Sequence, residues 1–353
     1  MTAVTDHRHH EEDSSALPVG TSPVFSAPAQ QEPDGEQPLG GSWEYLRGHE
    51  RPVPLGHDAY HALVRERMED LDRLDPGRDR LVADPRLIVA LDVDGTILDM
   101  DGRVSERMMT SIARMRHYGA QVVISTGRGI QAALPVARHV GLTDGWMVCA
   151  NGALTLCMDP TAPGGYRVVD SVTFDPTPAI RTLTQAVPDG IIAVEDLDAG
   201  FRTTRLFPEG ELIEEQTLAT LDELCSRPVT RVILRAPGMA VEEFSALVAG
   251  SGLHSVEYAI GWTAWLDVAP EGVTKASALQ TLAERLGTDS DHALAVGDGT
   301  NDIEMLSWAG AGVAMGSAPQ EVAQVAAMGT EPVWRDGCAA VLDAVVERKR
   351  AAC

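Results

Sequence analysis

The stretch that decides the fold of this chain is RLIVALDVDGT at residues 86–96. The run from Leu87 to Val93 is short and almost continuously apolar, as in a parallel strand that is buried on both faces. Polar clusters end this run and two later apolar runs, in the sequences DVDGT (92–96), STGR (125–128) and GDGTND (297–302). Ligands of open parallel sheets bind at the carboxyl ends of the strands, so we expect the three clusters to meet in one crevice.

Strands and helices alternate on both sides of this stretch. Further apolar runs predict strands over 122–125, 146–150, 293–296 and 312–315. Helical spacing predicts helices over 105–118, 130–139, 275–286, 303–308, 319–327 and 339–348. This alternation indicates an α/β fold, a Rossmann-like parallel sheet with helices on both faces. The core is split into residues 86–158 and 267–350, because the segment between them has a different pattern.

The intervening segment, residues 159–266, is predicted to be an inserted α+β domain. Its candidate strands cover 167–174, 191–197, 201–205, 229–235, 254–260 and 263–268. Its candidate helices cover 177–187, 211–225 and 241–250. Short turns join two of the strand pairs, which favours antiparallel pairing.

The first 85 residues form an N-terminal extension that we expect to be mostly disordered. In residues 1–40 only one basic residue, Arg8, stands among seven acidic residues, and prolines recur throughout. Such a segment buries too little apolar surface to offset its ordering entropy. Apolar residues at helical spacing predict one amphipathic helix over 57–75, docked on the main body or on a partner chain. A homodimer is therefore left open.

Composition narrows the classes of function. The 353 residues include 52 acidic and 28 basic side chains, which gives a formal charge of -24. This acidity argues against nucleic acid and against an anionic membrane surface as partners, because both attract clusters of Lys and Arg. The five cysteines are scattered and odd in number, which is typical of free thiols in a reducing cytoplasm.

Four carboxylates stand in the first and third polar clusters: Asp92, Asp94, Asp298 and Asp302. Two unit charges about 4 Å apart repel by about 4 kcal/mol at an effective dielectric constant of 20, so the crevice needs a cation. Oxygen ligands without His or Cys favour Mg²⁺ over zinc. Mg²⁺ sites commonly combine one or two carboxylates with substrate phosphate, so the clusters predict a phosphorylated substrate. The spacing fits neither a calcium-binding loop nor a dinucleotide fingerprint.

Taken in order, four motifs resemble those of the haloacid dehalogenase superfamily, most closely its Cof-type phosphatase branch with an inserted type-IIB cap domain. The motifs are Asp92-x-Asp94-Gly95-Thr96, Thr126-Gly127-Arg128, Lys275 and Gly297-Asp298-x-x-Asn301-Asp302. The sequences NGA (151–153) and APEGVTK (269–275), which flank the insertion, also resemble this branch. The resemblance covers about residues 86–350.

The resemblance implies a role for each motif residue. Asp92 would attack phosphorus and form an aspartyl-phosphate, while Asp94 would protonate the leaving oxygen and then activate water. Thr126 and Lys275 would complete the catalytic set by binding and neutralising the phosphate. Mg²⁺ would be held by Asp92, the main-chain carbonyl of Asp94, Asp298 and Asp302. The substrate would contact Gly95, Thr96, Gly127, Arg128, Asn151 and Asn301.

The expected function is that of a cytoplasmic, Mg²⁺-dependent phosphatase whose partner is a small phosphorylated metabolite, either a sugar phosphate or a phosphorylated cofactor. Every candidate catalytic residue lies outside residues 159–266, so the insertion is expected to select the substrate. Two alternatives stay open: a phosphomutase that uses the same aspartyl-phosphate, and a non-catalytic regulatory protein on the same fold. The complete acid–base and metal-binding set argues against the second.

Overall fold

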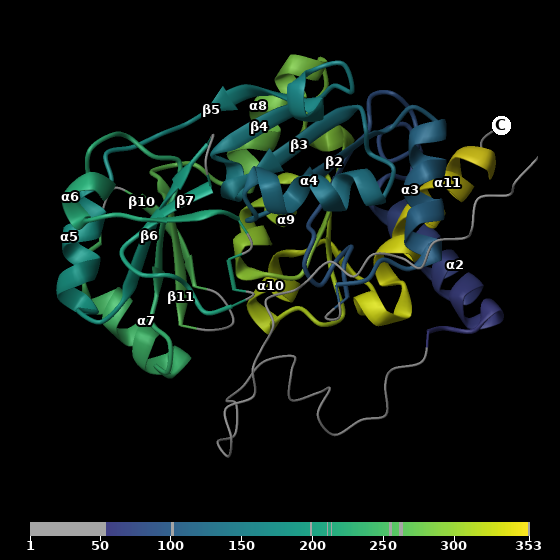
Figure 1. Cartoon of the computed structure of the whole chain (residues 1–353). Helices are drawn as coiled ribbons and strands as arrows, with labels where there is room; N and C mark the ends of the chain where they lie inside the picture. The colour runs from purple at the N-terminus through teal and green to yellow at the C-terminus, as the bar shows by residue number, and fades with distance from the viewer. Residues whose placement is uncertain are drawn as a thin grey trace, which may run out of the picture.

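Two sheets organise the computed structural model of this chain, and they form two lobes (Figure 1). The structure describes residues 54–99, 102–197, 200–209, 211–212, 214–253, 256–260 and 264–351. The predicted disorder of residues 1–40 lies outside these described residues. None of the helices in the described ranges is long and apolar enough to cross a membrane.

The larger lobe is built on an eight-stranded sheet in the order β14-β13-β12-β1-β2-β3-β4-β5. Its strands are β1 (Ile88–Leu91), β2 (Gln121–Ser125), β3 (Gly145–Cys149), β4 (Leu154–Met158), β5 (Tyr166–Ser171), β12 (Ala293–Gly297), β13 (Ala311–Ala314) and β14 (Met328–Gly329). The strands from β14 to β3 run parallel, whereas β3, β4 and β5 pair antiparallel. The predicted α/β fold with a parallel core is confirmed, and β1 lies between β12 and β2.

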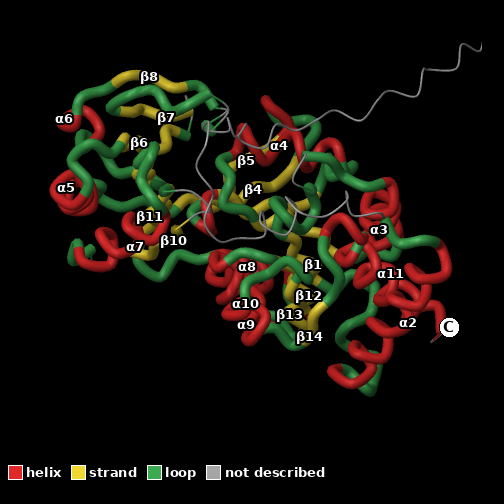
Figure 2. The backbone as a smooth tube through the Cα atoms, turned by 90° about the horizontal axis from the view of Figure 1, so that it is seen from below, coloured by secondary structure: helices red, strands yellow, loops and turns green. Residues whose placement is uncertain are grey.

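Helices cover both faces of this sheet (Figure 2). They are α2 (His57–Leu74), α3 (Glu106–His117), α4 (Ile130–His139), α8 (Lys275–Leu286), α9 (Ile303–Trp308), α10 (Gln320–Val325) and α11 (Gly337–Ala351). In β1, Val89 and Leu91 join the apolar cluster of α3 and α11, while Ile88 and Ala90 join that of α8 and α9. All four side chains are buried, which explains why this strand is apolar without a break.

The smaller lobe, called the cap below, contains a six-stranded sheet in the order β10-β11-β9-β6-β7-β8. Its strands are β6 (Ile191–Asp196), β7 (Gly200–Thr203), β8 (Gln216–Leu218), β9 (Val232–Arg235), β10 (Val256–Ile260) and β11 (Trp265–Pro270). Its helices are α5 (Thr177–Ala186), α6 (Leu221–Leu224) and α7 (Val241–Gly250). The pairs β6–β7 and β10–β11 are antiparallel, as predicted, and only β7 and β8 among these described strands pair in parallel.

The boundaries of the cap differ from the predicted residues 159–266. The strand predicted over 167–174 is β5 of the larger sheet, because it forms a hairpin with β4 in which Met158 pairs with Tyr166. At the other end, β11 runs to Pro270 and pairs with β10 as far as that residue. The elements of the cap therefore lie within residues 177–270.

The helix predicted over 211–225 is wrong. The described residues of this segment contain β8 and then α6, a helix of only four residues. Thr220 starts that helix, because its side chain accepts a hydrogen bond from the backbone N–H of Glu223, whose carboxylate accepts one from the N–H of Thr220. Pairing with β7 keeps the residues before it extended. Helical spacing in the sequence carries no information on this long-range pairing.

The predicted helix over 57–75 is α2, and it packs along α11 of the larger lobe. The buried guanidinium of Arg348 in α11 joins the two segments: its Nε donates to Asp72 Oδ1 at 2.9 Å and its Nη2 to the carbonyl oxygen of Asp75 at 2.7 Å. Burial alone would raise the pKa of Asp75, but the backbone N–H of Leu81 and the charge of Arg348 help to lower it to about 2. A buried ion pair therefore anchors the end of α2.

Arg348→Met should lower the free energy of unfolding by about 3–5 kcal/mol, because the buried carboxylate of Asp75 loses its buried cation and keeps only the more distant, partly exposed Arg80. Urea denaturation of the full chain measures this change. The matched control is Arg350→Met on the exposed side of α11, which should alter stability by less than about 0.5 kcal/mol. Equal losses in the two variants would contradict an anchoring role for Arg348.

Candidate active site

Three loops at the carboxyl ends of neighbouring strands form the candidate active site. The first follows β1 and the second follows β2, while the third follows β12 on the other side of β1. A fourth segment, the first turn of α8, supplies Lys275. The hydroxyl of Thr274 fixes the start of this helix by accepting a hydrogen bond from the N–H of Ser277. The structure thus brings together side chains from both halves of the split core.

Lys275 lies at the centre of these loops and is completely buried. Its Nζ donates to Asp92 Oδ1 at 2.7 Å and to Asp302 Oδ1 at 2.6 Å. Burial alone would lower the pKa of Lys275, but the charges of the two aspartates outweigh this effect and raise it. The ammonium group is therefore cationic and holds both carboxylates in place.

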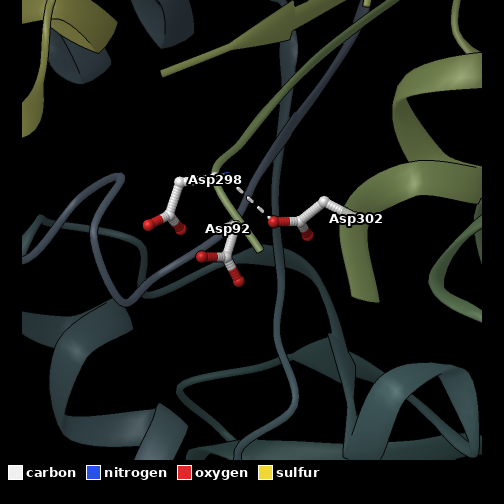
Figure 3. A group of neighbouring side chains, drawn as sticks. All are labelled: Asp92, Asp298 and Asp302. Atoms are coloured by element: carbon white, nitrogen blue, oxygen red, sulfur yellow. Dashed lines mark hydrogen bonds between the residues drawn. The ribbon is translucent and has the colours of Figure 1, made fainter. Parts of the chain in front are cut away.

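The carboxylates of Asp92, Asp298 and Asp302 lie side by side (Figure 3). One oxygen from each falls within 4.8 Å of the others, and all three side chains are buried. Asp302 is oriented by the backbone, because its Oδ2 accepts hydrogen bonds from the N–H groups of Asp298 at 3.0 Å and Gly299 at 2.9 Å. Such a set of convergent oxygen ligands suits a hard divalent cation.

The electrostatics of this group also fit a divalent cation. Burial raises the pKa of Asp92 to about 7, and Asp302 adds to the rise while Lys275 opposes it. Burial and the charge of Asp92 likewise raise the pKa of Asp298 well above its ordinary value. Three carboxylates and one ammonium leave two negative charges uncompensated, the number that one divalent ion neutralises.

The group of three carboxylates requires a glycine at position 95. Its φ is +83°, a left-handed conformation that glycine adopts without strain. A Cβ at this position would lie 2.2 Å from Asp298 Oδ2, so any side chain would displace that carboxylate. The neighbouring Thr96 is buried, and its Oγ1 has no hydrogen-bond partner among the described residues.

The carboxylate of Asp94 does not belong to the group of three carboxylates and pairs with Arg128. The Nε of Arg128 donates to Asp94 Oδ2 at 2.8 Å, and its Nη2 donates to Oδ1 at 2.5 Å. Burial would lower the pKa of Arg128, but the hydrogen bond to Asp94 and the charges of the nearby carboxylates together raise it. About half of the Asp94 side chain is exposed, in contrast to buried Asp92. The two aspartates therefore have different environments.

The remaining predicted contacts come from the loops that follow β2, β3 and β12. The buried hydroxyl of Thr126 accepts a hydrogen bond from the N–H of Arg128 at 3.1 Å. Asn301 donates from Nδ2 to Asn151 Oδ1 at 3.0 Å, across the sheet from β12 to β3. Asn151 has a φ of 52°, which asparagine tolerates better than most residues. A Cβ on Gly127 would lie 3.0 Å from the same Asn151 oxygen, so the loops after β2 and β3 are in contact.

A family model for haloacid dehalogenase-like hydrolases matches residues 89–165 and 212–342, more than half of the chain. The chain belongs to this family, in its Cof-type branch. Relatives named as phosphatases resemble it over most of their own length, and the chain is a phosphoric monoester hydrolase of this family.

The chain is similar to 5-amino-6-(5-phospho-D-ribitylamino)uracil phosphatase YitU of Bacillus subtilis, at 27% identity over 264 residues, 72% of this chain and 96% of that protein. It is also similar to pyridoxal phosphate phosphatase YbhA of Escherichia coli, at 28% identity over 258 residues, 67% of this chain and 89% of that protein. The solved phosphatase BT1666 from Bacteroides thetaiotaomicron shares the fold, with a TM-score of 0.59 and 24% identity over 73% of this chain and 94% of that chain.

A group of charged cap residues that no sequence motif indicates reaches the core beside Arg128. Arg231 donates from Nη1 to the carbonyl oxygen of Gly127 at 2.6 Å. Glu195 and Glu214 approach the next glycine, Gly129, from the same side. These residues come from separate segments of the cap and form no local motif, so only the folded arrangement reveals them.

Gly95→Ala should weaken Mg²⁺ binding at least tenfold, because the new methyl group would displace Asp298. Isothermal titration of the protein with Mg²⁺ measures this loss. The matched control is Gly141→Ala, which has a similar φ of +80° but nothing within 4 Å of its Cβ. Both variants should lose about 1–2 kcal/mol of stability through backbone strain. Equal Mg²⁺ affinities in the two variants would contradict the proposed crowding.

Proposed function

We propose that this chain is a Mg²⁺-dependent phosphatase that hydrolyses a small phosphorylated metabolite through an aspartyl-phosphate. The observation that carries the proposal is the buried ammonium of Lys275 between Asp92 and Asp302, next to Asp298. This arrangement holds a carboxylate nucleophile in a site that carries two uncompensated negative charges, which a divalent cation would neutralise. It supports phosphoryl transfer because countercharge is needed when an anionic nucleophile approaches a phosphate.

Asp92, Asp298, Asp302 and the main-chain carbonyl of Asp94 are the groups proposed to hold Mg²⁺. When bound, the ion supplies positive charge that neutralises the phosphate oxygens and offsets the repulsion among these carboxylates. Lys275 adds a second positive charge on the buried side. The hydroxyl of Thr126 is available to donate a hydrogen bond to a phosphate oxygen.

In the first step, a carboxylate oxygen of Asp92 attacks phosphorus and the bond from phosphorus to the leaving oxygen breaks. Asp94 gives a proton to that oxygen. To do so, the carboxyl group of Asp94 must break its hydrogen bonds to Arg128 and form one to the leaving oxygen. In the second step, Asp94 takes a proton from water, whose oxygen attacks phosphorus and releases Asp92 and inorganic phosphate. The exposed position of Asp94 suits proton exchange, and the buried position of Asp92 suits attack.

The substrate is proposed to be a sugar phosphate or a phosphorylated cofactor. The relatives YitU and YbhA support this class, because both are named for organic phosphate monoesters. Gly95, Thr96, Gly127, Arg128, Asn151 and Asn301 are the proposed substrate contacts. A phosphomutase remains the alternative, and release of inorganic phosphate during turnover distinguishes the phosphatase from it.

Asp92→Asn should lower the turnover of p-nitrophenyl phosphate by about three orders of magnitude or more and form no phosphoenzyme, because it lacks the nucleophile. Phosphate release in the presence of Mg²⁺, followed by denaturing mass spectrometry of the quenched protein, measures both effects. Chelation of Mg²⁺ should abolish phosphate release by the wild type, and added Mg²⁺ should restore this activity. A folded Asp92→Asn variant with normal turnover would refute the assignment.

Asp94→Asn should retain Mg²⁺ binding but lose about 10²–10⁴-fold in turnover of alkyl phosphates, because it cannot transfer a proton. The loss in phosphoenzyme formation should be smallest for p-nitrophenyl phosphate, whose leaving group needs no proton. Rapid-quench measurements on both esters provide the comparison. An equal loss in this step for the two esters would contradict the role of Asp94 as the acid.

A further inference from the structure

The position of Asp94 fixes the direction in which the leaving group extends, if the proposed function is correct. The acid must lie beside the leaving oxygen, so the leaving group extends from Asp92 towards Asp94. Arg128 is bound to Asp94 through two hydrogen bonds and is followed directly by Gly129 at the start of α4. The groups that face Gly129 therefore border the residue that pairs with the proposed acid.

Two carboxylates of the cap face this position. A Cβ on Gly129 would lie 2.5 Å from Glu195 Oε1 and 2.8 Å from Glu214 Oε1. Both glutamates are buried, and together with Ile130 they line a small cavity of about 10 Å³ between the cap and α4. This space holds no more than about one water, so a leaving group must replace the contact between the cap and Gly129.

Arg231 lies among these carboxylates with one donor unused. Its Nη1 donates to the carbonyl oxygen of Gly127 and to Asp267 Oδ1, at 2.6 and 3.3 Å, and its Nη2 donates to Glu195 Oε1 at 3.4 Å. Its buried Nε–H has no hydrogen-bond partner among the described residues, although only 6% of the side chain is exposed. A buried donor without a partner is destabilising, and an oxygen of a ligand would satisfy it.

The cap group carries an excess of negative charge. Glu195, Glu214 and Asp267 are three carboxylates near two cations, Arg231 and the Arg128 that Asp94 releases when it turns to the substrate, so one negative charge is in excess. Burial raises the pKa of the Glu214 carboxyl, against the lowering effect of Arg231. A second anion on the leaving group would meet like charges at short range, which weakens its binding. Hydroxyl and amino groups would instead donate hydrogen bonds to these carboxylates.

We propose that this cap group selects phosphate monoesters whose leaving group is rich in hydroxyl or amino groups and carries no second anion. Glu195 and Glu214 accept hydrogen bonds from the leaving group, and the Nε–H of Arg231 donates one to a hydroxyl oxygen. Sugar and amino-sugar monophosphates belong to this class, whereas phosphorylated sugar acids and bisphosphates are excluded from it.

Three six-carbon phosphate monoesters that differ in charge test the proposal: glucosamine 6-phosphate and the two open-chain esters sorbitol 6-phosphate and 6-phosphogluconate. The inhibition constant of each ester against Mg²⁺-dependent hydrolysis of p-nitrophenyl phosphate gives its affinity, whether or not the ester is itself cleaved. The constant for 6-phosphogluconate should be at least tenfold higher than the other two. Glu214→Gln should narrow this ratio severalfold, because it removes one of the repelling charges.

The matched control is Glu243→Gln, which removes the same charge from an exposed position on α7 and should preserve the wild-type ratio. Equal or tighter binding of 6-phosphogluconate to the wild type would overturn the proposal, as would an unchanged ratio in Glu214→Gln. Failure of the proposed function gives a different result, because the folded wild type would then not hydrolyse p-nitrophenyl phosphate with Mg²⁺ at all.

Discussion

The buried ammonium of Lys275 between Asp92 and Asp302 is the interaction on which the rest of the structure depends. Lys275 and Asp92 lie 183 positions apart, on opposite sides of the cap in sequence. A lysine with no exposed surface is stable only when its charge is paired, so both halves of the core must assemble around it. The cap can be inserted between them because β11 returns the chain to the start of α8, beside β1.

Lys275 supplies one positive charge to a group of three carboxylates, so two negative charges remain. The surrounding backbone and side chains stabilise these charges. Asp302 receives two backbone N–H groups as well as Lys275, and Gly95 leaves room for the carboxylate of Asp298. Asp94 stands apart and takes its cation from Arg128. Asp92 is buried and Asp94 is half exposed, so the two aspartates have unequal environments. The proposed roles of Asp92 as nucleophile and Asp94 as acid require this difference.

Much of the core was predictable from the sequence, because its signals are local. The apolar run through β1 indicated burial on both faces. The polar clusters after β1, β2 and β12 indicated the edge of the sheet where ligands bind. Features that depend on partners distant in sequence were not predictable. The sequence of β5 predicts a strand but does not show which sheet the strand joins. Its hairpin with β4 places it in the core sheet. The segment 211–225 has helical spacing, but pairing of β8 with β7 overrides it. The approach of Arg231 to Gly127 likewise has no local signature.

Attack of Asp92 itself on phosphorus is tested most directly by the stereochemical course of hydrolysis. The substrate is a phosphorothioate monoester made chiral at phosphorus with oxygen isotopes, hydrolysed in water that carries the third isotope. Each in-line displacement inverts phosphorus, so attack by Asp92 followed by attack of water predicts overall retention of configuration. Overall inversion would show that water attacks the ester in a single step, and would contradict the account.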